Sequence, residues 1–399
     1  MITPNGRSLP HRSVDGAKVY HLVAEPVRNV FCPGLAAECW GYNGGTPGPT
    51  IEATEGDRLR IYVTNRLPEP TSVHWHGIRL PNGMDGVSGL NQTRIEVGKT
   101  FRYEFVVPDA GTFMYHPHFD EMVQLAMGLQ GMLIVHPRRA TRLAPDRDFA
   151  IMLSEWSIPA GAARPNVLEM SDFNVLTMNS KAFPGTEPLV VAQGERVRIR
   201  FGNLSTSSHH PIHLHGHHFE VVETDGGVVP PSARTPLSTV LVPTGSTRAI
   251  ELIADNPGDW ALHCHMTHHM MNQMGHASPH AVGADAERLR RSVGRVVPGY
   301  MPMGANGMGE MSEMEMPYPD NSVPMLGARG QFGTIDMGGM VTVFKVRREL
   351  PRDGEEVGWY SMPRGTLARE ATNDELASDG IEVGEPVEAP SGHGDHSNH

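Results

Sequence analysis

The chain contains two copies of one sequence pattern, and this duplication limits its possible folds more than any other feature. Residues 51–65, IEATEGDRLRIYVTN, resemble residues 190–203, VVAQGERVRIRFGN. Further along, HWHGIRL at 74–80 and HLHGHHF at 213–219 match in the same order. Because the repeated unit is far longer than a solenoid repeat, we expect two related domains.

The match continues to the end of each copy. GTFMYHPHFDE (111–121) aligns without gaps with GDWALHCHMTH (258–268), and AMGLQGMLIVHP (126–137) matches DMGGMVTVFKVR (336–347). The first copy has almost nothing between these two segments. Residues 275–336 are therefore expected to be an insertion in the second copy.

Both copies show the alternation of apolar and polar residues that is typical of strands. RLRIYV and RVRIRF alternate in this way, and Gly, Pro, Asn and Asp interrupt such runs. With 44 glycines and 33 prolines, the chain favours short strands and turns over a helical bundle. We predict an all-β protein of two β-sandwich or barrel domains, with a short helical segment after each HxH motif.

We place the first domain at residues 1–140 and the second at residues 147–347, with MVTVFKV (340–346) as its last strand. Residues 348–399 are acidic and rich in Pro and Gly, so a flexible tail is expected there. Its end, SGHGDHSNH, is interpreted as a solvated terminus rather than a metal site.

Charge and hydropathy exclude some classes of partner. The net charge of -12 argues against nucleic acid or an anionic membrane surface as the main partner. No apolar run reaches the roughly 18 residues of a membrane span. The first residues, MITPNGRSLP, lack the regions of a signal peptide, so the protein is either cytoplasmic or has lost a leader.

The chain has three cysteines. Cys32 and Cys39 are separated by a Pro-Gly turn in FCPGLAAEC. A small disulfide between them would suit an exported protein, and two unpaired thiols are the alternative. The third, Cys264, lies in DWALHCHMTHHMMNQM among several histidines.

Pairs of histidines with one residue between them occur at matching places in the two copies. The pairs are His74/His76, His116/His118, His213/His215 and His263/His265. Alternate residues of a strand face the same side, so each pair can present two imidazoles to one site or to neighbouring metal ions. One pair alone is weak evidence, but eight imidazoles exceed the ligands of one ion. The sequence therefore predicts a metal cluster.

Cys264 lies between His263 and His265, so its side chain should point to the opposite face of the strand. One strand would then serve two metal sites. Three further donors are close enough in sequence to join the thiolate: His210, His269 and Met274. Two histidines, one cysteine and a weak axial methionine describe a blue-copper electron-transfer site. Zinc is the competing metal, but a solitary cysteine with a thioether favours copper.

The first copy lacks this second site. At or near the positions of Cys264, His269 and His210 it has Pro117, Met122 and Thr71. The paired histidines are kept while the thiolate site is absent, as expected if the two kinds of site have separate roles.

HWHG, HPH, HPIHLHGH and HCHMTHHMMNQM together resemble the four copper-binding segments of multicopper oxidases. The resemblance covers most of residues 18–275 and the strand near 340, and it implies two cupredoxin-like Greek-key domains. Many laccases have three domains, so the chain is most similar to the two-domain, small laccase-like members. One departure is HPH where many members have HSH, and it removes no ligand.

The resemblance implies four copper ions per subunit. The type 1 copper would be bound by His210, Cys264, His269 and Met274. The type 2 copper would be bound by His74 and His213. One type 3 copper would be bound by His76, His116 and His265, and the other by His118, His215 and His263. This division within the cluster comes from the family, not from spacing.

Asp85, in MDG after HWHG, matches an acidic position that family members use to relay protons to the cluster. A turn-forming aspartate in PNGMDG is the other interpretation. Asp120 is a further candidate for a proton relay.

The implied activity is the oxidation of diphenols and related donors, one electron at a time, with four-electron reduction of O2 to two waters. A donor would meet the edge of His210 or His269, and Cys264 would carry the electron to the cluster. Phenols and aromatic amines are the expected donors. Residues 301–325 are crowded with Met and Glu, and thioethers suit Cu(I), so a dedicated cuprous or manganese oxidase is an alternative. A packing flap is the other interpretation of this segment.

In two-domain relatives, the first domain of one chain meets the second domain of the next. The resemblance therefore implies a homotrimer with clusters between subunits. We expect a periplasmic or secreted protein whose leader has been removed.

Two other classes of copper protein share some of these sequence features. A copper nitrite reductase is also a trimer of two cupredoxin domains, but its copper cysteine lies in the first domain, where this chain has Pro117. It also needs no cluster of eight histidines. A copper-storage or chaperone protein would suit the methionine-rich insertion and would not need the paired HxH segments.

Overall fold

The computed structural model describes residues 1–139, 144–273, 285–296, 320–324, 327–350 and 355–384. Met274, the methionine-rich residues 301–319 and the end of the acidic tail fall outside them. The chain divides into two compact units, one of Met1–Pro279 with Ser312–Tyr360 and one of His280–Met311 with Ser361–His399. The second unit contains the helices α2 (Ala286–Val293) and α4 (Asn373–Ser378).

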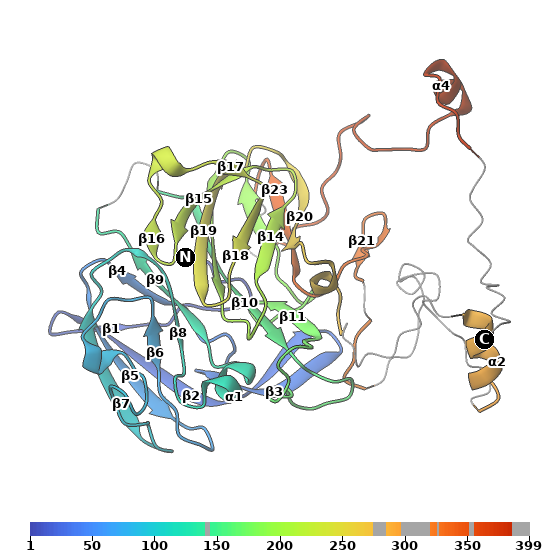
Figure 1. Ribbon diagram of the computed structural model, residues 1–399. Coiled ribbons are helices and arrows are strands. Elements are labelled where there is room, and N and C mark those ends of the chain that lie inside the picture. Colours follow the sequence, from blue (N-terminus) through green and yellow to red (C-terminus); the bar gives the residue numbers. More distant parts are fainter. Residues whose placement is uncertain (140–143, 274–284, 297–319, 325–326, 351–354, 385–399) are drawn as a thin grey trace. The chain divides into compact units, whose positions relative to one another are not determined.

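All described strands lie in the first unit, and those of its first half form two sheets (Figure 1). One sheet has the order β1-β2-β5-β7, with β3 paired to β2; the other has the order β4-β9-β8-β6. The strands are β1 (Arg12–Val14), β2 (Ala17–Cys32), β3 (Leu35–Tyr42), β4 (Ile51–Thr54), β5 (Arg58–Asn65), β6 (His74–His76), β7 (Thr100–Val106), β8 (Gly111–His116) and β9 (Gly131–His136).

The second half of this unit is built in the same way. One sheet has the order β11-β10-β13-β19-β15-β16 with β17 on β15, and the other the order β12-β23-β20-β14-β18. The strands are β10 (Arg147–Trp156), β11 (Val175–Met178), β12 (Leu189–Ala192), β13 (Arg196–Asn203), β14 (His210–Leu214), β15 (Phe219–Thr224), β16 (Gly227–Val228), β17 (Pro236–Leu237), β18 (Thr239–Val242), β19 (Ser246–Ile253), β20 (Gly258–Cys264) and β23 (Val341–Arg347). The short strands β21 (Arg329–Gly330) and β22 (Gly333–Thr334) pair with each other.

The duplicated sequence gives duplicated pairing, which confirms the all-β prediction. β5 pairs parallel with β2 and antiparallel with β7, just as β13 pairs parallel with β10 and antiparallel with β19. The expected helical segments follow the second HxH motif of each half, as α1 (Glu121–Ala126) and the 3-10 turn η3 (Thr267–Met270), whereas a turn after His213/His215 leads directly into β15. Two further 3-10 turns are η1 (Asn82–Met84) and η2 (Pro231–Ala233).

Asparagine ends the repeated strand in both copies and holds the loop that follows. In each case the side-chain oxygen accepts a bond from the N–H two residues on, and the amide donates to two carbonyls. The partners are Leu67, Glu69 and Ile95 for Asn65, and Ser205, Ser208 and Val242 for Asn203. Because both asparagines are fully buried, their polar atoms need these partners.

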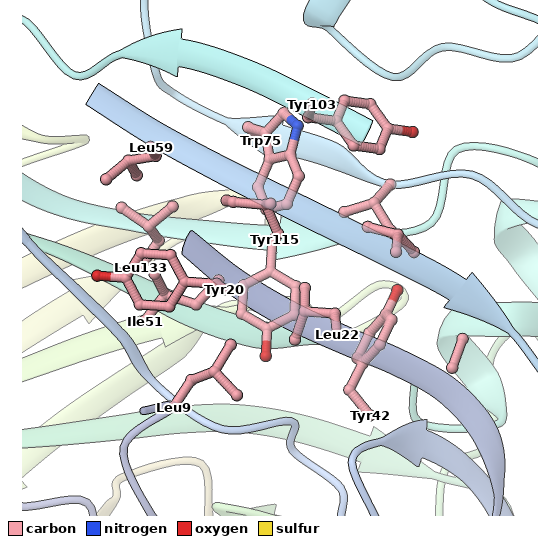
Figure 2. Close-up of a cluster of buried hydrophobic side chains, with 14 of the residues drawn as sticks. Leu9, Tyr20, Leu22, Tyr42, Ile51, Leu59, Trp75, Tyr103, Tyr115 and Leu133 are labelled. Carbon is pink, nitrogen blue, oxygen red and sulfur yellow. The ribbon is translucent and has the colours of Figure 1, made fainter. Parts of the chain in front are cut away.

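Aromatic side chains fill the core beneath the first HxH motif (Figure 2). Trp75 is fully buried, with ring centroids 5.3 Å from Tyr103 and 6.2 Å from Tyr115. Tyr115 in turn packs against Tyr42 at 5.3 Å. Because side chains alternate along a strand, burying Trp75 turns His74 and His76 to the opposite face of β6. The core thus orients the two imidazoles.

A buried ionic network joins the two halves. Arg200 on β13 is 1% exposed and makes two bonds to Asp148, at 2.8 and 3.0 Å, and one to Glu223, at 2.8 Å. It also donates to Thr112 Oγ1 on β8 at 2.7 Å. Since β8 carries His116, this network fixes one histidine strand against the sheet of the other half.

The disulfide interpretation is wrong, because all three cysteines are free and buried. The β2–β3 register places Cys39 opposite Val27 and Cys32 opposite Leu35. Cys32 is therefore five residues along the hairpin from Cys39's partner, a separation of about 16 Å at the usual rise per residue. A disulfide needs Cα atoms within about 7 Å.

No helix among the described residues has the length and hydropathy that a membrane span requires.

Candidate metal centres

Four histidines of the first half converge at the ends of β6 and β8. The pairing of these strands sets His74 opposite His116. From the ring of His74, the centroids of His76, His116 and His118 lie at 5.7, 5.3 and 5.7 Å. His76 Nδ1 and His116 Nε2 approach to 3.3 Å, a spacing that suits two ligands of one ion.

The four histidines of the second half form a matching group. The register of β14 and β20 sets His213 opposite His263. The ring of His213 lies 4.8 Å from that of His215 and 5.6 Å from those of His263 and His265. Here the closest nitrogens are the Nε2 atoms of His215 and His263, at 3.1 Å. The HxH spacing therefore brings the predicted residues together in both halves.

Backbone carbonyls fix the orientation of one ring on each histidine strand. In each case Nδ1 lies within hydrogen-bond distance of a carbonyl oxygen: His74 with Asp85 at 2.8 Å, His116 with Pro117 at 2.9 Å, His213 with Ser238 at 2.7 Å and His263 with Cys264 at 2.9 Å. Since Nδ1 is the donor to a carbonyl, Nε2 is left with its lone pair. This is the arrangement by which proteins prepare imidazoles for metal ligation.

A separate site is built around Cys264. Its Sγ lies 3.3 Å from His269 Nδ1 and 3.7 Å from His210 Nδ1, and the two nitrogens are 3.3 Å apart. Ser205 Oγ lies 2.7 Å from His210 Nε2, so that the other nitrogen faces the thiol. The predicted partners of Cys264 therefore meet, apart from Met274, which lies outside the described residues.

Burial sets the charge state of this site. Cys264 and His210 are fully buried and His269 is 2% exposed. Burial raises the pKa of Cys264 to about 12 and lowers the pKa of His210 to about 3 and that of His269 to about 4. Neutral imidazoles are the form that binds metals, and a thiolate here needs a cation beside it. One sulfur and two nitrogen donors in an apolar pocket fit copper.

The imidazole rings of His210 and His269, whose edges were expected to meet an electron donor, are therefore buried. The exposed imidazoles beside them belong to His209 and His268. The ring of His268 lies 4.2 Å from that of His269, centroid to centroid.

Two acids lie beside the first histidine group. Asp85 Oδ1 is 3.4 Å from His74 Nδ1, so the structure brings the predicted relay residue to the histidines. Glu121, which sequence reasoning missed, lies 3.4 Å from His116 Nδ1 and 3.5 Å from His118 Nε2. The neighbouring candidate Asp120 is exposed and precedes α1 in the left-handed region, with a φ of 44°. The signal for Glu121 was an acidic residue three positions after His118, where a helical segment was expected to begin.

A pocket of about 520 Å³ opens beside the first group. The first half contributes the four histidines with Glu121, Met122 and Leu125, and the second half contributes Leu204, Ser205, Thr206, Thr244 and Gly245. Within the described part of the chain, no ring contact joins a histidine of one group to a histidine of the other. The two groups are therefore separate within one chain.

Comparison with known proteins identifies the family. A family model described as multicopper oxidase matches residues 27–140, and a second model with the same description matches residues 160–281. Together they cover more than half of the chain. The chain belongs to the multicopper oxidase family.

Two curated proteins of known name are similar to parts of this chain. Copper resistance protein A of Escherichia coli is 39% identical over 145 residues, which are 36% of this chain and 23% of that protein. Laccase of Pycnoporus cinnabarinus is 34% identical over 209 residues, 48% of this chain and 40% of that protein. The chain thus spans less than half the length of these curated relatives.

The crystal structure of a blue copper oxidase from Nitrosomonas europaea has 26% sequence identity and a TM-score of 0.59, covering 82% of this chain and 85% of that one. Its fold is that of a cupredoxin-type multicopper oxidase, as the sequence motifs predicted. Copper is accordingly the cofactor of this multicopper oxidase, and the sulfur and nitrogen donors described above suit it.

Proposed function

We propose that this multicopper oxidase is laccase-like and couples one-electron oxidation of small donors to the four-electron reduction of O2 to water. The observation that carries the proposal is the arrangement at the end of β20, where Cys264 faces the buried single-metal site while its neighbours His263 and His265 belong to the second histidine group. When bound, copper supplies the one-electron redox chemistry that this coupling requires. The peptide bonds from Cys264 to its two neighbours are a covalent connection between the sites.

We assign the ligands as the resemblance implies. His210, Cys264, His269 and Met274 would hold type 1 copper. The approach of His76 to His116 supports placing these two, with His265, on one type 3 copper. The approach of His215 to His263 supports placing these two, with His118, on the other. His74 and His213, each held at Nδ1 by a carbonyl, are left for type 2 copper.

Two carboxylates are positioned to supply protons for oxygen reduction. Asp85 lies beside His74, and Glu121 lies beside His116 and His118 in the pocket. We propose Asp85 as the relay residue, as the motif suggests. Its main-chain carbonyl holds the ring of His74, so the carboxylate is left for proton transfer.

We propose that a neighbouring chain completes each cluster. The second-half residues that wall the first group's pocket are Leu204–Thr206, Thr244 and Gly245, and none of them is a histidine. A cluster of eight imidazoles therefore needs the second group of another chain. Head-to-tail contacts of this kind close into a ring, which supports a homotrimer. Sedimentation of copper-loaded protein should give a trimer; a monomer with full copper and turnover would contradict this.

Phenols and aromatic amines are the proposed donors. A cuprous or manganese oxidase is the second candidate, and one contact favours it. The N–H of Val323, near the end of the insertion, donates to Gln273 Oε1 at 2.9 Å. Val323, near the end of the methionine-rich stretch 301–325, therefore contacts the loop that carries His269, and thioethers suit Cu(I).

We propose a periplasmic or secreted location, as the resemblance implies. We also propose that the domains divide at residues 1–140 and 147–347, each containing one group of four histidines.

The function is tested by oxygen uptake of copper-loaded protein with a simple phenol, Cu(I) and Mn(II) as donors. Four tightly bound coppers per chain and donor-dependent oxygen consumption are expected. Variable copper binding without oxygen consumption would instead identify a copper buffer. Rates that favour Cu(I) or Mn(II), and that fall when residues 301–325 are deleted, would select the metal-ion oxidase.

Cys264→Ser provides the sharper test of the sites. The variant should lose the blue colour and donor oxidation, because the hydroxyl does not replace the thiolate as a ligand. It should keep the copper held by the histidine groups. A fully blue and active Cys264→Ser protein would overturn the proposal.

A further inference from the structure

The backbone of Met340 connects two ligands of the single-metal site. The N–H of Cys264 donates to the carbonyl of Met340 at 3.1 Å, and the N–H of Met340 donates to the carbonyl of His269 at 2.9 Å. The N–H of Gly338 donates to the carbonyl of Met270 at 2.6 Å. The segment 338–340 therefore sets the spacing between the strand that ends at Cys264 and the loop that carries His269.

This segment lies too close to the loop for any side chain at its centre. Gly339 has a φ of 60°, and a Cβ there would run into the carbonyl oxygen of His269. A Cβ at Gly338 would lie 2.7 Å from the amide nitrogen of Asn272. Hydrogen bonds between the segment and the loop hold this close approach.

Asn272 makes that connection and is 2% exposed. Its Oδ1 accepts a bond from the N–H of Gly339 at 2.8 Å. Its amide donates to the carbonyl of Phe183 at 3.0 Å and to that of Pro324 at 3.3 Å. Phe183 is in turn bridged to Gly339, whose carbonyl accepts its N–H at 2.9 Å. Both amide hydrogens and the oxygen of Asn272 are thus used, each by a different segment of the chain.

We propose that Asn272 is a positioning residue that holds His269 in reach of Cys264 before copper binds, and that it ties this geometry to the end of the insertion through Pro324. The inference rests on the proposed function, because it assumes that these two residues bind copper. It goes beyond that function because a residue that is not a ligand sets the distance between His269 and Cys264. The neighbouring bond from Val323 to Gln273 adds a second tie between the insertion and the same loop.

The chain offers a matched control in Asn65. It is fully buried and also accepts one main-chain bond and donates two, but its partners lie in the first half, away from Cys264. Asn65→Ala and Asn272→Ala therefore remove the same number of bonds. A merely structural asparagine would give the same outcome at both positions.

The experiment titrates copper-free protein with Cu(II) and follows the visible absorption of the thiolate–copper bond, with copper content and thermal unfolding in parallel. In Asn272→Ala the affinity of the thiolate site should fall about 10- to 100-fold, the usual effect of losing a residue that orients a ligand. The absorption maximum should shift, while copper at the histidine groups is retained. Asn65→Ala should lower the unfolding temperature and leave the absorption and affinity unchanged.

An Asn272→Ala protein with wild-type absorption and affinity would overturn the inference and leave the proposed function standing. If that variant does not fold, Asn272→Asp decides, because it keeps the volume and the bond from Gly339 but loses both donated bonds. Wild-type absorption and affinity in Asn272→Asp would also overturn the inference. Wild-type protein that forms no such absorption would refute the proposed function and this inference with it.

Discussion

The hydroxyl of Thr71 donates a hydrogen bond to Gln124 Oε1 at 2.7 Å, at the place in the first half that corresponds to the single-metal site of the second. Both side chains are fully buried. The amide of Gln124 also donates to Pro70 O at 2.8 Å and to Glu69 Oε1 at 3.1 Å. A hydrogen-bond network thus closes the first half where His210, Cys264 and His269 meet in the second.

Breaking this network should affect stability and leave the copper sites intact. Thr71→Val leaves Gln124 Oε1 buried without its donor, which should lower the free energy of unfolding by about 1–3 kcal/mol. Urea unfolding of the copper-free protein measures the loss. Thr100→Val is the control, because Thr100 is exposed and shares its hydrogen bond with Thr64 at the surface. Equal stability of the two variants would contradict the role given to the network.

The sequence predicted the convergence of the histidines because strand alternation is a local property. His74 and His76 share one face of β6 whatever lies elsewhere in the chain, and the duplication then places their counterparts. That the side chain of Cys264 faces away from those of His263 and His265 likewise follows from alternation alone.

The supporting residues are invisible to such reasoning because their partners are far away in the sequence. Asn272 connects Phe183, Pro324 and Gly339, and no spacing in the sequence points to this. Asp120 was a relay candidate and Glu121 was not considered, because the residue types do not show that the backbone at Asp120 is left-handed. The thiol pair Cys32 and Cys39 misled for a similar reason, since a hairpin register depends on the pairing of the whole of β2 and β3.

Loss of the buried arginine between the two halves should be strongly destabilising. Arg200→Met leaves Asp148 without its cation and Glu223 with only Arg198, at 3.5 Å, in a largely buried site, which should cost about 3–5 kcal/mol. Arg102→Met is a suitable control, because the Arg102 side chain is 54% exposed and solvent screens its ion pair with Glu104. The loss of unfolding free energy should be severalfold larger in Arg200→Met than in Arg102→Met. Similar losses in the two variants would show that the buried network contributes little.

Acid should remove a specific part of the stability of the first half. The hydrogen bond from His136 to Glu52, at 3.0 Å, with a second from Ser8, lowers the pKa of Glu52 to about 2 from its ordinary 4.5. Because the folded-state pKa is lowered, the unfolded chain binds more protons. The contribution of Glu52 is therefore complete above about pH 4.5 and is lost as the pH falls toward 2.

Glu52→Gln tests this pH dependence. The free energy of unfolding of the copper-free variant should fall less steeply than that of the wild type as the pH is lowered from about 6 to about 2. This range covers roughly the titration of a carboxyl group. Glu38, whose side chain is 57% exposed, provides the control. A Glu52→Gln protein that follows the wild-type curve throughout would show that this carboxylate does not contribute.

Substitution of Asp85 should slow oxygen reduction without disturbing the copper sites. The ring of His74 is held by the main-chain carbonyl of Asp85, at 2.8 Å, and this bond survives any change of side chain. Asp85→Ala therefore removes only the carboxylate, which lies 3.4 Å from the same nitrogen. If the carboxylate relays protons, the rate of oxygen consumption at saturating donor should fall about 10²- to 10⁴-fold.

Copper content, the absorption of the thiolate site and the rate at which a donor bleaches it without oxygen should all remain at wild-type values. Asp109→Ala, which breaks an exposed ion pair with Arg79, should match the wild type in every assay. Retained turnover in Asp85→Ala, accompanied by a lower unfolding temperature, would instead identify Asp85 as a turn-forming residue at the end of η1. A parallel loss of copper would mean that the carboxylate supports the ligand His74, and the proton would then have to come by way of another acid, of which Glu121 is the nearest to His116 and His118.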